Sequence, residues 1–193
     1  MYLGLLAALS ASAAAGMRIA LPLLIVGLLQ SDSLWENVPL LSMIHPQVLL
    51  GILTSWSLFE LFGSKKLLGL RILQMVQLGF SPIVGALMGI TAAKITQSQF
   101  DLELGPLWLI GLIGGVLAFV LKFVQVGWFF RLQKLPLWAI FSEDILCIFL
   151  VFFAFQAPEQ GGLIAMLLLW LSVRSSQEWY RWYRKSSKKK RRL

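Results

Sequence analysis

Hydrophobic residues form long runs along this chain, separated by short polar segments. A transmembrane helix needs about 20 mainly apolar residues, because a rise of ~1.5 Å per residue must cross a hydrocarbon layer of ~30 Å. Six runs come near this length, over residues 3–29, 48–63, 83–95, 107–130, 137–155 and 163–180. The pattern predicts an all-α, polytopic membrane protein with about six transmembrane helices.

The first run departs from a uniform apolar helix. It contains the small-residue stretch Ser10–Gly16, followed by Arg18 and Pro22, and this predicts one broken or kinked span. The alanines at 13–15 also resemble a signal-peptide cleavage site, but the uncharged start of the chain argues against cleavage.

Residues 67–78 form a second exception. Arg71, Gln74 and Gln77 alternate with leucines at helical spacing, and the segment is too polar to span a membrane. We expect an amphipathic helix lying in the membrane interface. The sequence Phe80-Ser-Pro82 is expected to end this helix and to open the third span.

Composition narrows the classes of function. The chain is 58% hydrophobic and 13% charged, which is unlike a soluble domain. The single Cys147 excludes an internal disulfide framework, and the single His45 excludes any site that needs two histidines. We predict no metal site and no cofactor.

The distribution of the net charge of +8 indicates how the chain is oriented in the membrane. With the N-terminus inside, the basic residues at 65, 66, 71, 131 and 134 and all those from 174 onward fall on one side, and the opposite loops keep only Lys94. Because Lys and Arg gather in cytoplasmic loops, both termini are predicted to be cytoplasmic.

The chain is expected to be one transmembrane domain over residues 1–185 with a basic cytoplasmic tail over residues 186–193. The tail either binds anionic lipid headgroups or acts only as a stop-transfer signal, and both interpretations stay open. Nucleic-acid binding is not predicted, because no folded surface of aromatic and basic residues accompanies the tail. The headgroup candidates are Lys188, Lys189, Lys190, Arg191 and Arg192.

Short motifs in a fixed order resemble a known family. They are the opening segment at 10–24 (SASAAAGMRIALPLL), LFEL at 58–61, SPIVGAL at 81–87 and SEDIL at 142–146. Together these resemble the uncharacterised bacterial membrane-protein family called domain of unknown function 4126. The resemblance implies a multi-pass protein of a bacterial inner membrane and no known activity. Ser64-Lys65 stands where the family has Asp-Lys, and a His expected shortly before Lys122 is absent.

Five charged residues fall inside predicted spans, where an unpaired charge is costly. A cluster of facing acids and counter-ions could carry a cation or protons, because neighbouring carboxylates do not all ionise cheaply. The alternative is interhelical pairing that fixes the packing of the helices. The five candidates for an ion or substrate pathway are Arg18, Glu60, Lys122, Glu143 and Asp144.

Spans one to three and four to six would form two halves of opposite orientation, as in many secondary transporters. The second span of each half carries acid, but the halves share no clear sequence similarity. Small residues allow close helix packing, which is the preferred interpretation of both Gly-x-x-x-Gly pairs. The candidates for a helix break or for packing are Ser10, Ser12, Gly16, Pro22, Pro82, Gly85, Gly89, Gly111 and Gly115.

Two functions remain. The first is a small transporter or channel-like protein for an ion or small solute. The second is a non-catalytic assembly or structural subunit of a larger membrane complex. The expected partners are an anionic lipid bilayer and either a second copy of the chain or a larger complex. An enzyme is not predicted, since no pair of nucleophile and base is evident.

Overall fold

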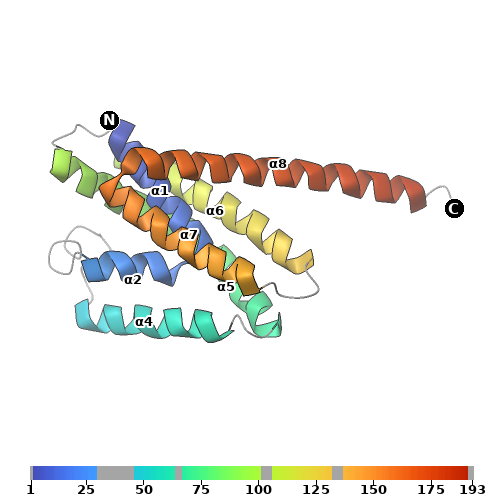
Figure 1. Cartoon of the computed structure of the whole chain (residues 1–193), viewed down its shortest axis with the longest axis horizontal. Coiled ribbons are helices and arrows are strands. Elements are labelled where there is room, and N and C mark those ends of the chain that lie inside the picture. The colour runs from blue at the N-terminus through green and yellow to red at the C-terminus, as the bar shows by residue number, and fades with distance from the viewer. Residues whose placement is uncertain (1, 30–45, 64–66, 101–105, 132–136, 191–193) are drawn as a thin grey trace.

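The computed structural model describes residues 2–29, 46–63, 67–100, 106–131 and 137–190. These residues form helices and no strand, so the predicted all-α class is confirmed. The helices are α1 (Tyr2–Met17), α2 (Ala20–Leu29), α4 (Pro46–Gly63), α5 (Leu67–Phe100), α6 (Leu107–Arg131), α7 (Leu137–Gln156) and α8 (Pro158–Lys190) (Figure 1).

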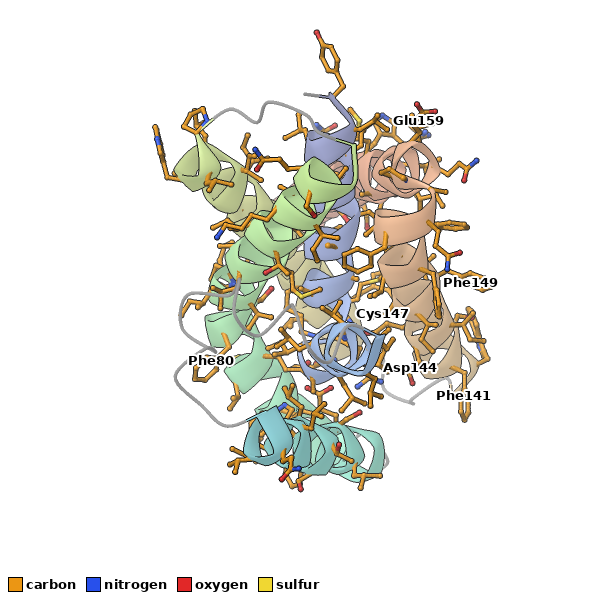
Figure 2. The ribbon with its side chains drawn as sticks, turned by 90° about the vertical axis from the view of Figure 1, so that its left-hand side faces the viewer. Phe80, Phe141, Asp144, Cys147, Phe149 and Glu159 are labelled. Atoms are coloured by element: carbon orange, nitrogen blue, oxygen red, sulfur yellow. The ribbon has the colours of Figure 1, made fainter. Side chains whose placement is uncertain are left out.

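Helix α1 lies at the centre of the molecule and contacts α5, α6, α7 and α8. Figure 2 shows α1 with α5 on one side and α7 and α8 on the other. Its sequence is mostly Ala, Ser and Gly, and every side chain from Ser10 to Met17 is buried. Small side chains let backbones approach closely, so this composition allows four helices to pack on one.

Two serines of α1 bind its neighbours directly. Ser10 Oγ donates a hydrogen bond of 2.7 Å to the carbonyl oxygen of Leu150 on α7. Ser12 Oγ donates one of 2.8 Å to the carbonyl oxygen of Gly85 on α5. Bonds from hydroxyl groups to backbone carbonyls of other helices fix the rotation of α1 within the bundle.

Glycines line the contacts of α5 and α6. A Cβ at Gly85 would overlap the Ala118 side chain, and one at Gly16 would lie 2.8 Å from the Ala118 Cα atom. A Cβ at Gly89 would lie 2.7 Å from Ser12 Oγ. The glycine pairs therefore serve close packing here, as their spacing indicates.

The first run breaks later than the small-residue stretch suggests. Helix α1 continues through Ser10–Gly16, and the chain leaves the helix at Arg18 and Ile19. Pro22 lies in the first turn of α2, where a missing N–H has no intrahelical partner to lose. Helices α1 and α2 then run in different directions (Figure 1).

The predicted helix end at Pro82 is wrong. Helix α5 runs through it over 34 residues, so there is no separate amphipathic helix at 67–78. Gln74 and Gln77 are buried inside the bundle and do not form the exposed polar face that an amphipathic helix would have. Adjacent helices support a backbone that proline interrupts. Here α6 lies so close that a Cβ at Gly115 would be 2.7 Å from the Pro82 carbonyl oxygen.

The other predicted runs match helices closely, except the last. Residues 48–63, 107–130 and 137–155 correspond to α4, α6 and α7. Helix α8 begins at Pro158, includes Gly161 and Gly162, and extends past the bundle to Lys190 (Figure 1). Five residues of the predicted tail, 186–190, thus belong to α8.

Two helical segments are long and apolar enough to cross a membrane: Ile72–Ser98, with 27 residues, and Leu107–Trp128, with 22. This finding concerns only the residues that the structure describes, so the number of transmembrane spans stays a prediction. His45, Arg191, Arg192 and the acidic residues at 32, 36, 101 and 103 lie outside the described residues. The side chains of Lys188–Lys190 also lie outside them.

Replacing Gly85 with Leu should destabilise the protein by about 1–3 kcal/mol, because the new side chain overpacks the contact with Ala118. Gly79→Leu on the same helix is the matched control, since a Cβ there meets nothing within 4 Å. Thermal unfolding in detergent, followed by tryptophan fluorescence, compares the two. Equal melting temperatures would contradict the packing described here.

Candidate functional site

The C-terminal end of α1 is where the charged side chains meet. The last regular bond of the helix runs from the Arg18 N–H to the Ala14 carbonyl oxygen, at 3.0 Å. Beyond it, the helix has carbonyls without intrahelical partners, which carry partial negative charge. This end of α1 therefore attracts cations.

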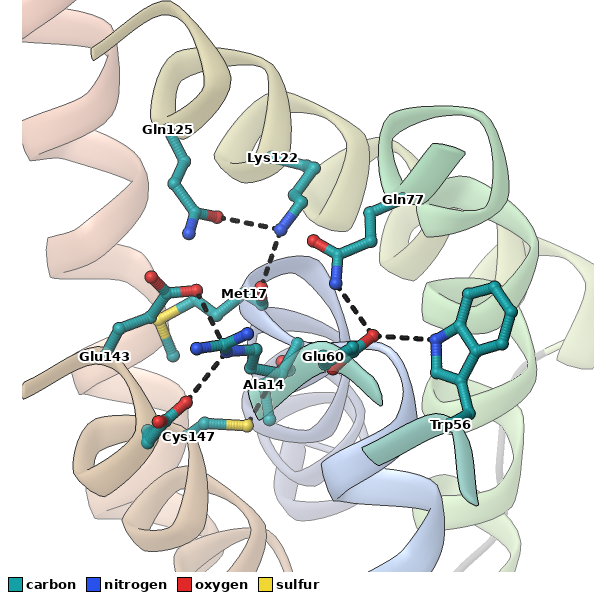
Figure 3. A network of polar contacts seen from close by, with 11 residues as sticks. Ala14, Met17, Trp56, Glu60, Gln77, Lys122, Gln125, Glu143 and Cys147 are labelled. Carbon is teal, nitrogen blue, oxygen red and sulfur yellow. Dashed lines mark hydrogen bonds and ion pairs between the residues drawn. The ribbon is translucent and has the colours of Figure 1, made fainter. Parts of the chain in front are cut away.

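Lys122 supplies one of these cations from α6. Its Nζ atom donates a hydrogen bond of 2.8 Å to the Met17 carbonyl oxygen and one of 3.3 Å to Gln125 Oε1 (Figure 3). The side chain is 1% exposed. Lys122 thus caps α1 from a neighbouring helix, and Gln125, one turn further along α6, supports it.

Arg18 supplies the second cation at the helix break. Its Nε atom lies 2.8 Å from Asp144 Oδ1 and 3.6 Å from Glu143 Oε1, both on α7. The Nε–H is not aligned for a hydrogen bond to either acid, so both contacts are ion pairs. The exposed fraction of the side chain is 8% for Arg18, 12% for Glu143 and 18% for Asp144. Both ion pairs are therefore largely shielded from solvent.

Glu60 reaches the same region from α4. Its Oε1 atom accepts hydrogen bonds from Trp56 Nε1, at 2.8 Å, and from Gln77 Nε2, at 2.7 Å. The residue is 3% exposed. Two neutral N–H donors therefore stabilise this buried carboxylate.

The structure therefore brings together all five charged residues expected inside the spans. Figure 3 shows Glu60, Lys122 and Glu143 around the end of α1. We call the five residues the charged cluster: Arg18, Glu60, Lys122, Glu143 and Asp144. With every group ionised it holds two positive and three negative charges. By formal charge, one carboxylate is therefore in excess.

A cavity of about 430 Å³ opens beside the charged cluster. Residues of α1, α6, α7 and α8 line it, and most of its wall is apolar. Glu143 and Gln125 are among the lining residues. Glu143 thus contacts Arg18 and faces the cavity, which connects the buried charges to a space that a small ligand could enter.

The break and packing candidates lie away from this chemistry. Ser10 and Ser12 bind backbone carbonyls, and Gly85, Gly89, Gly111 and Gly115 lie at contacts between helices. Only the break beside Arg18 belongs to the charged cluster. Among the described residues, no group of three or more His, Cys, Asp or Glu side chains could hold a metal ion.

Four neighbours of the charged cluster are not among the predicted site residues: Trp56, Gln77, Gln125 and Cys147. Trp56 and Gln125 lie one helical turn from Glu60 and Lys122, so helical spacing was an available signal. Cys147 Sγ lies 3.5 Å from the Ala14 carbonyl oxygen, and Gln77 comes from a different helix than Glu60. No local signal identifies those two contacts.

Comparison with known proteins places the chain. The model of the family described as domain of unknown function, DUF4126, matches residues 5–178. The chain belongs to this family. No curated protein and no solved structure matches it. The matched DUF4126 region includes the whole charged cluster, and Ser64 and Lys65, where the sequence departs from the family pattern, lie outside the described residues.

A double-mutant cycle tests the ion pairs. Arg18→Gln should lower the free energy of unfolding by about 3 kcal/mol, because it leaves two shielded carboxylates without their counter-ion. Adding Asp144→Asn should recover part of that loss, with a coupling energy of about 1–3 kcal/mol. Denaturant unfolding in mixed micelles measures each variant.

The control for this cycle replaces Asp144→Asn with Glu159→Gln, an exposed residue at the start of α8. Its effect should add to that of Arg18→Gln within about 0.5 kcal/mol. Additivity in the Arg18–Asp144 cycle as well would show that the two charges do not interact.

Proposed function

We propose that this DUF4126 protein spans the membrane several times and has both termini in the cytoplasm of a bacterial cell. Two segments long enough to cross a membrane support this, as does the apolar outer surface. On α6, Leu112, Val116, Phe119 and Phe123 follow one another at helical spacing and are all exposed. Exposed apolar surfaces of this extent are typical of contact with lipid or with another protein.

The orientation can be tested at the end of α8. Cys147→Ala removes the single cysteine, so Lys190→Cys in that background provides one labelling site. A membrane-impermeant maleimide should label it only after right-side-out vesicles are permeabilised, because the basic C-terminus is expected inside. Labelling of Lys190→Cys in intact vesicles would place the C-terminus outside and contradict the predicted orientation.

We further propose that the protein is a small transporter or channel-like protein for an ion or small solute. The observation that carries this is the position of Glu143, which pairs with Arg18 at the helix break and lines the 430 Å³ cavity. Charges kept only for packing would need no adjoining cavity. A carboxylate at a cavity wall offers a site that a cation or proton can occupy and leave.

The arrangement of the acids supports two halves of opposite orientation. Glu60 on α4 and Glu143 on α7 come from the second predicted span of each half, and both reach the end of α1. A site formed where a broken helix meets both halves is typical of secondary transporters. The break at Arg18 would supply that helix.

A flux assay in proteoliposomes tests the function. Glu143→Gln should reduce cation or proton flux at least tenfold while leaving insertion intact, because it removes the charge at the cavity wall and keeps the side chain's shape. Glu159→Gln, at the start of α8 and well above Asp144 in Figure 2, is the matched control. It should leave flux unchanged.

Flux is measured for a panel of common monovalent and divalent cations, and separately for protons under a pH gradient. Wild-type flux equal to that of empty vesicles across the panel would overturn the proposal. Equal flux through the wild type and Glu143→Gln would move the pathway away from the charged cluster.

Helix α4 supports the second candidate, an assembly subunit of a larger membrane complex. It contacts α2 and α5, whereas its own residues Val48, Ile52 and Phe59 line an open apolar hollow of about 540 Å³. Such a face could pack against another subunit. Co-purification of a stoichiometric partner in mild detergent would favour this candidate, and a homogeneous homo-oligomer would favour the transporter.

A further inference from the structure

Helix α4 lies at the edge of the molecule and is held there at two points. Figures 1 and 2 show it beyond α2, away from the helices that surround α1. Among the side chains of α4 that the structure describes, only Leu53 and Glu60 are buried. They are separated by about two helical turns, so they lie on the same face of the helix.

The two points of attachment differ in kind. Leu53 packs against Leu23 and Leu24 of α2. Glu60 accepts hydrogen bonds from Trp56 Nε1 and from Gln77 Nε2, at 2.8 and 2.7 Å. Of these two donors, only Gln77 belongs to another helix, α5. The bond from Gln77 therefore joins α4 to the bundle, whereas the bond from Trp56 stays within α4.

The polar attachment of α4 covers one side of the charged cluster. Figure 3 shows Glu60 on one side of Met17 and Ala14, at the end of α1, and Glu143 on the other. The cavity of about 430 Å³ adjoins Glu143, and its lining residues come from α1, α6, α7 and α8. Helix α4 thus closes the side of the charged cluster that faces away from this cavity.

Elements with few buried contacts open at a low cost in free energy, and the lids of binding sites are typically such elements. A buried carboxylate depends strongly on its hydrogen-bond donors, because leaving it without them is costly. From this geometry we infer that α4 is a lid on the charged cluster, docked by the hydrogen bond between Glu60 and Gln77. The inference rests on the proposed function, since an undocked α4 would give the transport site a second entrance.

The position of α4 can be measured by double electron–electron resonance on the full chain in lipid nanodiscs. Spin labels on Ser55→Cys of α4 and Met166→Cys of α8, in a Cys147→Ala background, report the distance between lid and bundle. Labels on Ile83→Cys of α5 and Met166→Cys form the reference pair within the bundle. The three labelled positions are exposed, so the labels fit without repacking.

Gln77→Met and Glu60→Met each remove the bond between the helices and keep a side chain of similar length. Each should raise the fraction of molecules with a changed α4–α8 distance about tenfold, because a hydrogen bond to a charged group is lost. Glu60→Gln should leave this fraction near that of the wild type, since its amide oxygen still accepts from Gln77.

Trp56→Phe is the matched control, because it removes the other hydrogen bond to the same carboxylate. That bond lies within α4 and persists whether or not the helix is docked. Its loss therefore affects both states alike, and the α4–α8 distances should stay as in the wild type.

Unchanged α4–α8 distances in both Gln77→Met and Glu60→Met would overturn the inference. So would an equal change in the reference pair, because Glu60 would then hold the whole bundle together and not a lid. Since the distances are measured without flux, the two proposals fail separately. Flux through a protein whose α4 never undocks removes only the lid, and undocking without any flux removes the transporter.

Discussion

The helices of this protein meet at α1 only because its side chains are small. Ala, Ser and Gly let α5, α6, α7 and α8 approach one central helix, and the hydroxyls of Ser10 and Ser12 bind backbone carbonyls across two of these contacts. Glycines on the facing helices allow the same approach from the other side. Larger residues in α1 would separate the four helices and disperse every group that they position.

The charged cluster follows from where α1 stops. The chain leaves the helix at Arg18, so the guanidinium and the last carbonyls occupy the same small region. Lys122 binds one of those carbonyls, and two acids of α7 bind Arg18. A helix end, two cations and three acids thus stabilise one another in a setting where each alone would be costly. The cavity at Glu143 gives this interior arrangement an opening.

Much of the fold is predictable from run length, because α4, α6 and α7 are bounded by residues that end apolar segments. The convergence of the charges was predictable from the cost of burying them. The positions at which the helices break were not predictable from the sequence. Pro82 remains helical because α6 packs against it, and Ser10–Gly16 remains helical because neighbouring helices enclose it. Such support comes from residues distant in sequence. For the same reason Gln77, a polar residue in an apolar helix, could not be assigned to Glu60.

The proposed function depends on Glu143 joining the buried charges to an accessible cavity. The direct measurement is the rate at which a small cationic methanethiosulfonate modifies Glu143→Cys in a Cys147→Ala background, compared with Ala118→Cys, which is buried between helices. Glu143→Cys should react at least tenfold faster than Ala118→Cys. Equal, slow reaction at both positions would show that Glu143 is enclosed and that the charged cluster serves packing alone.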